Sequence, residues 1–190
     1  MSQKYIKQLS DDLKHVMSNV EDIILIGSSV LGKDKPADTD LIIVFNEKVD
    51  EKILSKVKDA VPNAHIIPKT RKALFAESFQ AREGVLFHGI SLKTGKQVAE
   101  SYGGVGGMII SYSLEGKSKS DRMRFYYSLH GRKKEEGGMY DELKLKKLAD
   151  GVFYCLPEYY YPLTEYLDQW EIPYKEIPVL FPARILKMIK

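Results

Sequence analysis

Apolar residues in the first half of the chain recur with two different periods, which predict helices and strands in alternation. A spacing of three to four residues over 3–17 is typical of an amphipathic helix. The unbroken apolar runs DIILIG and DLIIVF indicate short strands that are covered on both faces. The other predicted elements of this half are a helix over 50–60 capped by Asp50, a strand over 64–68, a helix over 71–83 and a strand over 84–92.

Glycines interrupt this pattern at SYGGVGG, residues 101–107, where we predict a hinge. The predicted elements beyond it are a helix over 117–131 that ends at Gly131, a helix over 141–150, a strand over 151–157, a helix over 158–170 interrupted by Pro162, and a strand over 174–181. The predicted class is α/β (α+β). We expect a mixed β-sheet backed by helices in residues 1–100, and a small mixed α/β C-terminal region in residues 108–190.

The composition is that of an ordinary globular protein, with 44% hydrophobic and 29% charged residues among 190. No apolar run approaches the roughly 18 residues that span a bilayer, so we expect no membrane partner. Cys155 is the single cysteine, which excludes an internal disulfide and a multi-cysteine zinc site, and we expect a cytoplasmic location. The net charge of +3 is compatible only with a local basic patch.

The segment ILIGSSVLGKDKPADTDLIIVF contains two overlapping phosphate-binding patterns. In the first, Gly27, Gly32 and Lys33 have the P-loop spacing G-x-x-x-x-G-K. A P-loop also needs Ser or Thr after the lysine, and a helix beginning there whose N-terminus holds the phosphates. Asp34 and Pro36 follow instead, and the next strand begins too soon for a helix to fit. This context excludes the P-loop.

The second pattern places two carboxylates beside a Gly-Ser turn. A strand ends at Gly27-Ser28, nine residues intervene, and Asp38 and Asp40 lead into the next strand. Residues i and i+2 of a strand share a face, so we expect these two carboxylates to converge where a divalent cation and phosphate oxygens would meet them. This order of strand, Gly-Ser, Asp-x-Asp and strand resembles the signature of the DNA polymerase β-like nucleotidyltransferase superfamily, in the form of its minimal members. The resemblance covers residues 1 to about 92.

The resemblance implies a polymerase β-like nucleotidyltransferase fold. It also implies transfer of a nucleoside monophosphate from a nucleoside triphosphate, such as ATP, to a hydroxyl acceptor. Mg²⁺ or Mn²⁺ is the implied cofactor, with Asp38 and Asp40 as catalytic metal ligands. Gly27 and Ser28 would bind the nucleotide, and Lys33 would neutralise phosphate charge. The acceptor stays open between nucleic acid, a protein side chain and a small molecule.

Members of the superfamily usually carry a third carboxylate on a later strand, which completes the metal site and serves as the base. The third predicted strand has His65 at the aligned position, and the fourth has His88 but no acid. Three explanations stay open: Glu83, Glu77 or Glu100 folds into the site; a histidine is the third ligand or base; or catalysis is lost and the domain binds nucleotide, nucleic acid or a protein partner. Each histidine also has a purely structural interpretation.

Basic and aromatic residues are interleaved in the C-terminal segment KSKSDRMRFYYSLHGRKK. Basic side chains bind phosphates, and exposed aromatic rings stack on bases. The candidate nucleic-acid contacts are Lys117, Lys119, Arg122, Arg124 and Arg132. The alternative is that the aromatic residues of this segment are core and its charges form a solvated face. We expect Trp170 to pack within the C-terminal region.

Overall fold

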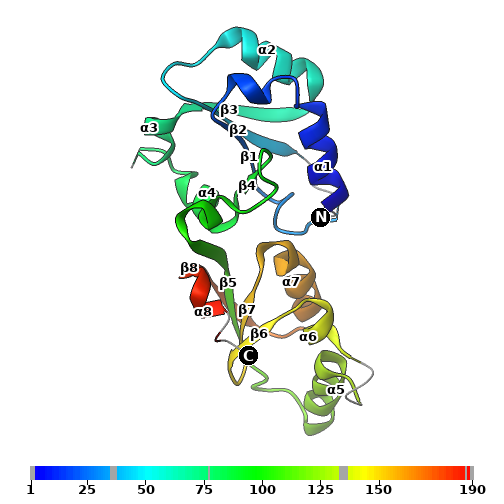
Figure 1. The fold of residues 1–190 in the computed structure, drawn as a ribbon. Helices are drawn as coiled ribbons and strands as arrows, with labels where there is room; N and C mark the ends of the chain where they lie inside the picture. The colour runs from blue at the N-terminus through cyan, green and yellow to red at the C-terminus, as the bar shows by residue number, and fades with distance from the viewer. Residues whose placement is uncertain (1–2, 35–37, 77, 133–136, 187, 189–190) are drawn as a thin grey trace.

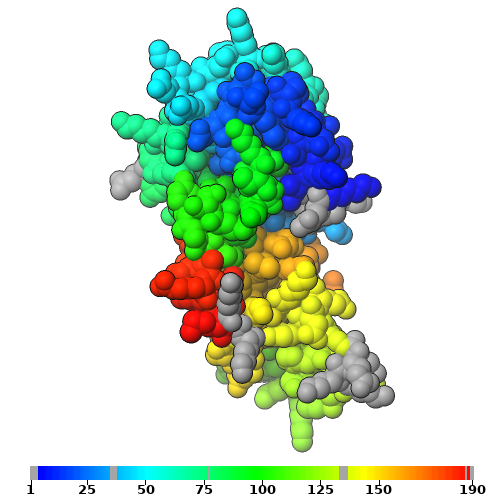
Figure 2. All heavy atoms as spheres, viewed as in Figure 1, coloured from blue at the N-terminus to red at the C-terminus, as the bar shows by residue number. Residues whose placement is uncertain are grey.

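Two four-stranded sheets, each with its own helices, make up the protein (Figure 1). The computed structural model describes residues 3–34, 38–76, 78–132, 137–186 and 188. The first sheet lies in the N-terminal half of the chain and the second in the C-terminal half. Figure 2 shows that the two halves pack on each other as an elongated molecule. No helix within the described ranges is long and apolar enough to cross a lipid bilayer.

The N-terminal sheet is mixed, as predicted, and has the strand order β3-β2-β1-β4. Strand β1 is antiparallel to both β2 and β4, whereas β3 is parallel to β2. The elements of this half are α1 (Gln3–Asp12), the 3-10 turn η1 (Met17–Asn19), β1 (Asp22–Ile26), β2 (Thr39–Phe45), α2 (Glu51–Ala60), β3 (Ala64–Thr70), α3 (Arg71–Leu74), α4 (Arg82–His88) and β4 (Ile90–Ser91).

Strands β1 and β2 are buried on both faces, which explains why their sequences are unbroken apolar runs. One face packs with α1 and α2, and the opposite face packs with residues of the segment from α3 to Val98. The inward side chains of these strands are Ile23, Leu25, Leu41 and Ile43 on the first face, and Ile24, Ile26, Ile42 and Val44 on the second. This packing holds the ends of β1 and β2 in a fixed position.

The C-terminal sheet is antiparallel throughout, with the order β6-β7-β5-β8. Its core contains Phe125, Phe153 and Leu163, which come from a helix, a strand and a second helix. The elements of this half are η2 (Val98–Tyr102), β5 (Gly104–Tyr112), α5 (Lys119–His130), α6 (Met139–Glu142), β6 (Lys146–Ala149), β7 (Val152–Cys155), η3 (Pro157–Tyr159), α7 (Tyr160–Gln169), β8 (Tyr174–Pro182) and α8 (Ala183–Leu186).

Several predicted elements differ from the structure. The predicted strand over 84–92 is the helix α4 followed by the two-residue β4, because an apolar run without a clear period fits a buried helix as well as a strand. The predicted helix over 141–150 is wrong. Helix α6 ends before Lys144, whose φ is +49°, and the following residues pair with β7 as β6. Among the described residues of the helix predicted over 71–83, those of α3 and the start of α4 are helical.

The segment 101–107, the predicted hinge, consists of the end of η2, the left-handed Gly103 and the first residues of β5. A Cβ on Gly106 would overlap the main-chain carbonyl of Phe87, so this glycine lets the two halves approach closely. The Gln97 side chain accepts a hydrogen bond from Gly106 N at 2.9 Å and donates one to Gly106 O at 3.3 Å. Gly106 therefore forms part of a tight junction between the two halves.

Candidate active site

The Gly-Ser turn follows directly on β1 and lies against a carboxylate of β2. Gly27 has a φ of +83°, a conformation that favours glycine. A Cβ at this position would lie 2.5 Å from Asp40 Oδ2, so the missing side chain is what lets the carboxylate sit against the turn. Lys33 N donates to Ser28 O at 3.3 Å, which closes the turn.

Asp40 occupies the centre of the site because its strand is central in the sheet. It pairs with Ile26 of β1 on one side and with His65 of β3 on the other. His65 Nδ1 lies 3.0 Å from Asp40 Oδ1, and the two side chains are 67% and 31% exposed. This register sets His65 directly beside Asp40. Asp40 is thus bracketed by the glycine turn and an accessible imidazole.

Asp38 lies just before β2 and is exposed. Thr39 separates it from Asp40, and the Thr39 hydroxyl is hydrogen bonded to the Tyr5 hydroxyl of α1 at 2.6 Å. Within the described ranges, no group of three or more His, Cys, Asp or Glu side chains is gathered closely enough to hold a metal ion. The side chains of the described residues therefore do not form a complete metal cage on their own.

The other candidates for the third acid have different surroundings. Glu83 is exposed in the first turn of α4. Glu100 accepts a hydrogen bond from Gln97 N at 3.1 Å and caps η2. Glu77 lies outside the described residues. His88 is the last residue of α4, so the prediction that it lies on a strand is wrong. His65 is the candidate that contacts Asp40.

Burial of His88 has a consequence for the pH dependence of stability. Burial lowers the pKa of His88 below its usual 6.5, so the unfolded chain binds a proton more readily than the folded one. Folding stability should therefore fall as the pH drops through and below about 6.5. We expect His88→Gln to lose less stability than wild type between about pH 7.5 and 5.5, measured as urea midpoints. Equal losses in the two proteins would contradict this role, and the exposed His15→Gln is the control.

The loop after the Gly-Ser turn is docked on the C-terminal half. Tyr161 N donates to Leu31 O at 3.0 Å. Gly32, with a φ of +87°, packs against the main-chain carbonyl of Glu158, where a Cβ would overlap it. The Lys33 ammonium lies 5.8 Å from the centroid of the Tyr161 ring. Residues from both halves thus support the loop, and nothing in the sequence pattern indicates the contribution of α7.

The candidate nucleic-acid contacts lie elsewhere, in and around α5, at the end of the molecule away from β1 and β2 (Figure 1). Lys119, Arg122 and Arg124 are exposed on α5 itself. Lys117 is half-buried and donates to Trp170 O at 2.9 Å, and Arg132 is exposed just after the helix. The structure therefore separates the basic segment from the carboxylates of β2.

Comparisons of the chain with protein-family models, with curated proteins and with solved structures gave no match.

Proposed function

We propose that the protein is a magnesium-dependent nucleotidyltransferase, which moves a nucleoside monophosphate from a nucleoside triphosphate to a hydroxyl acceptor. The observation that carries the proposal is the setting of Asp40. Its Oδ2 faces the positive-φ turn at Gly27, and its Oδ1 lies 3.0 Å from His65 Nδ1. A carboxylate, an approachable backbone and a titratable imidazole are three groups that phosphoryl chemistry uses.

The donor set fits a magnesium ion that arrives with its nucleotide. Mg²⁺ is usually bound by one or two carboxylates together with phosphate oxygens and waters, so it does not need a protein cage of three ligands. Asp38 and Asp40 would supply the carboxylates, and Mn²⁺ shares this preference for oxygen. When bound, the ion supplies neutralisation of phosphate charge during transfer.

The glycine turn and its loop would hold the triphosphate. Gly27 lets the Asp40 carboxylate lie against the turn, and Ser28 would offer an amide and a hydroxyl to the phosphates. Lys33 is exposed and close to the turn in sequence, so its ammonium would reach the negative charge of the phosphates. These contacts would orient the nucleotide in the site.

His65 would act as the base in place of the usual third acid. In the tautomer with the proton on Nδ1, this nitrogen donates a hydrogen bond to Asp40 Oδ1. Nε2 then has a free lone pair that can accept the proton of an attacking hydroxyl. The 67% exposure of His65 gives an acceptor molecule access to this nitrogen. The Asp40 carboxylate also stabilises the imidazolium that forms, as an adjacent negative charge does.

Replacement of His65 tests this assignment. We expect His65→Ala to slow transfer by roughly 10²- to 10⁴-fold, the usual contribution of a general base. The measurement is the rate of label transfer from an α-phosphate-labelled nucleoside triphosphate across a range of pH. His15→Ala, a change of the same kind at an exposed position, should leave the rate unaltered. An unchanged rate for His65→Ala would remove His65 from the chemistry.

The absence of a three-ligand group in the described ranges favours a second candidate, a protein that keeps the fold but binds nucleic acid or a protein partner without catalysis. The substitution His65→Asp separates the two, because it introduces the third carboxylate beside Asp40. Transfer by wild type supports the enzyme. An inactive wild type with an active His65→Asp variant supports lost catalysis.

A further inference from the structure

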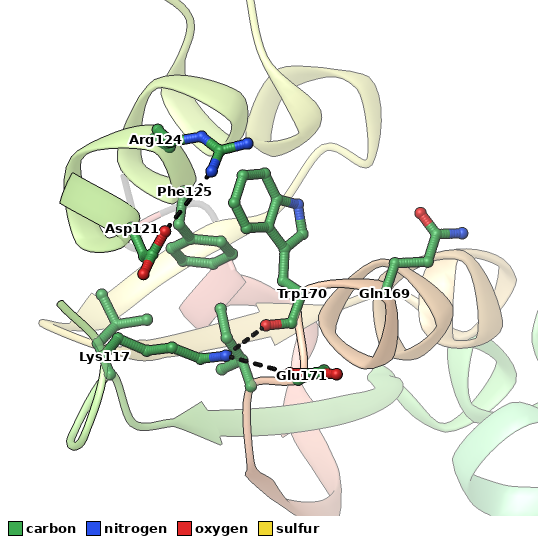
Figure 3. A pocket seen from close by; sticks show the side chains of 9 residues that line it. Lys117, Asp121, Arg124, Phe125, Gln169, Trp170 and Glu171 are labelled. Atoms are coloured by element: carbon green, nitrogen blue, oxygen red, sulfur yellow. Dashed lines mark hydrogen bonds and ion pairs between the residues drawn. The ribbon is translucent and has the colours of Figure 1, made fainter.

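The C-terminal half has a pocket of about 440 Å³ between α5 and the end of α7 (Figure 3). Its walls combine aromatic and charged side chains. They include Lys117, Asp121, Arg124, Phe125, Trp170 and Glu171. Pockets of roughly 300 Å³ or more are large enough for a small organic ligand. The pocket shares no residue with the carboxylate site of β2.

Trp170, the single tryptophan of the chain, lines this pocket and packs against Phe125. Phe125 is buried and meets Trp170 edge to face, with ring centroids 5.6 Å apart and planes at 76°. The Arg124 guanidinium lies 6.0 Å from the centre of the indole ring. As expected, Trp170 packs within the C-terminal region, but it remains half-buried and also borders the pocket.

Aromatic and cationic groups continue from this pocket along α5. Arg124 and Tyr127 are three residues apart and so are neighbours on the helix surface. The Arg132 guanidinium lies 6.0 Å from the centroid of the Tyr127 ring. Aromatic rings and cations therefore alternate along this surface, which we call the α5 track and define as Trp170, Arg124, Tyr127 and Arg132. A planar base stacks on an aromatic ring, and a phosphate pairs with an arginine.

The surface of α5 is not an ordinary solvated face. Tyr126 is 54% exposed and Tyr127 is 40% exposed, so the interpretation that these rings are core residues holds only for Phe125. Residues 117–132 contain five Lys or Arg and one acidic residue, so this segment has a formal charge of +4 where the whole chain of 190 residues has +3. This combination suits an anionic partner that also presents flat apolar rings.

We propose that the α5 track binds single-stranded nucleic acid, with one base in the Trp170 pocket and the backbone along Arg124 and Arg132. A duplex would hide its bases from the rings, so the exposed aromatics favour a single strand. Two carboxylates at the pocket are compatible with this ligand, because Asp121 pairs with Arg124 at 3.6 Å and Glu171 with Lys117 at 3.8 Å. Their remaining lone pairs can accept from the amino groups of bases.

The test uses the intrinsic fluorescence of Trp170 and the full chain. Fluorescein-labelled mixed-sequence single strands of about 12 nucleotides, one DNA and one RNA, are titrated in EDTA, so the outcome does not depend on a metal or on the nucleotide site. We expect saturable binding seen by anisotropy, together with quenching of the tryptophan as a base stacks. The same sequence as a duplex should bind at least about tenfold more weakly.

Paired variants locate the site. We expect Trp170→Leu and the double variant Arg124→Gln/Arg132→Gln each to weaken binding about tenfold. The arginine double variant should also reduce the slope of log K against log salt concentration by about 0.7 for each phosphate that it no longer neutralises. The control is Lys52→Gln/Lys56→Gln on α2, which removes the same charge from exposed positions of the other half. Thermal unfolding of each variant checks that the fold is kept.

Four results would overturn the proposal. One is a single strand that binds without quenching Trp170. Another is equal affinity for single strand and duplex. The third is a loss of affinity in the α2 control as large as that in the α5 pair, which would indicate general attraction to a positively charged protein. The fourth is displacement of the oligonucleotide by poly-glutamate as effectively as by an unlabelled single strand. This result would mean that the surface binds any polyanion.

Discussion

Asp40→Asn should reduce the rate of nucleotidyl transfer on the order of 10³-fold or more. A carboxylate that helps to hold a metal ion at the reacting phosphate contributes several kcal/mol to the stability of the transition state, and its loss slows the reaction by this factor. The amide has nearly the size of the carboxylate, so the packing against Gly27 is preserved while the negative charge is removed. His65 would then be without the anion that stabilises its imidazolium. Label transfer from an α-phosphate-labelled nucleoside triphosphate measures the effect.

The matched control for Asp40→Asn is Asp34→Asn in the same loop. Asp34 is exposed and is not part of the proposed site, so its neutralisation should change the rate less than about twofold. A rate that falls equally in both variants would indicate a general charge effect on the loop. A full rate for Asp40→Asn would show that the chemistry is not at the end of β2.

Gly32→Ala should lower the free energy of unfolding by roughly 2–5 kcal/mol. Two costs combine: the left-handed backbone at φ +87° disfavours a side chain, and the new methyl group would overlap the Glu158 carbonyl. Because the loop is docked there, the variant should also weaken nucleotide binding. Urea unfolding measures the first effect and nucleotide titration the second.

Gly116→Ala separates these two costs. Its φ of +81° is close to that of Gly32, but no atom lies within 4 Å of the position its Cβ would take. We expect this control to cost only about 1–2 kcal/mol, from the backbone alone. Equal destabilisation by the two substitutions would mean that contact with the C-terminal half does not hold the loop.

The sheet of the N-terminal half is predictable where burial leaves a clear pattern. Strands β1 and β2 are covered on both faces, so their apolar runs are unbroken, and α2 carries its cap at Asp50. The run over 84–92 is equally apolar but helical in α4, because composition alone does not distinguish a buried helix from a buried strand. The glycines around the start of β5 have the composition of a hinge, but within the strand Gly106 accommodates the backbone of Phe87 and Gly107 the ring of Tyr154.

The site is predictable as far as its residues are close in sequence or follow from strand pairing. Gly27 and the two aspartates form a local motif, and the resemblance aligns His65 with the third acid, whereas its contact with Asp40 comes from the parallel register of β2 and β3. The support of the loop by Glu158 and Tyr161 could not be predicted, because these contacts join segments more than 120 residues apart that share no periodic pattern. The exposure of Tyr126 and Tyr127 likewise depends on which face of α5 the sheet covers.

Isothermal titration of a nucleoside triphosphate, with and without Mg²⁺, tests the proposed site most directly. It compares wild type with the double variant Asp38→Ala/Asp40→Ala. We predict that wild type binds the nucleotide only with the metal and that the double variant does not bind it. Binding that needs no metal, or that the double variant retains in full, would contradict a nucleotide site built on these two carboxylates.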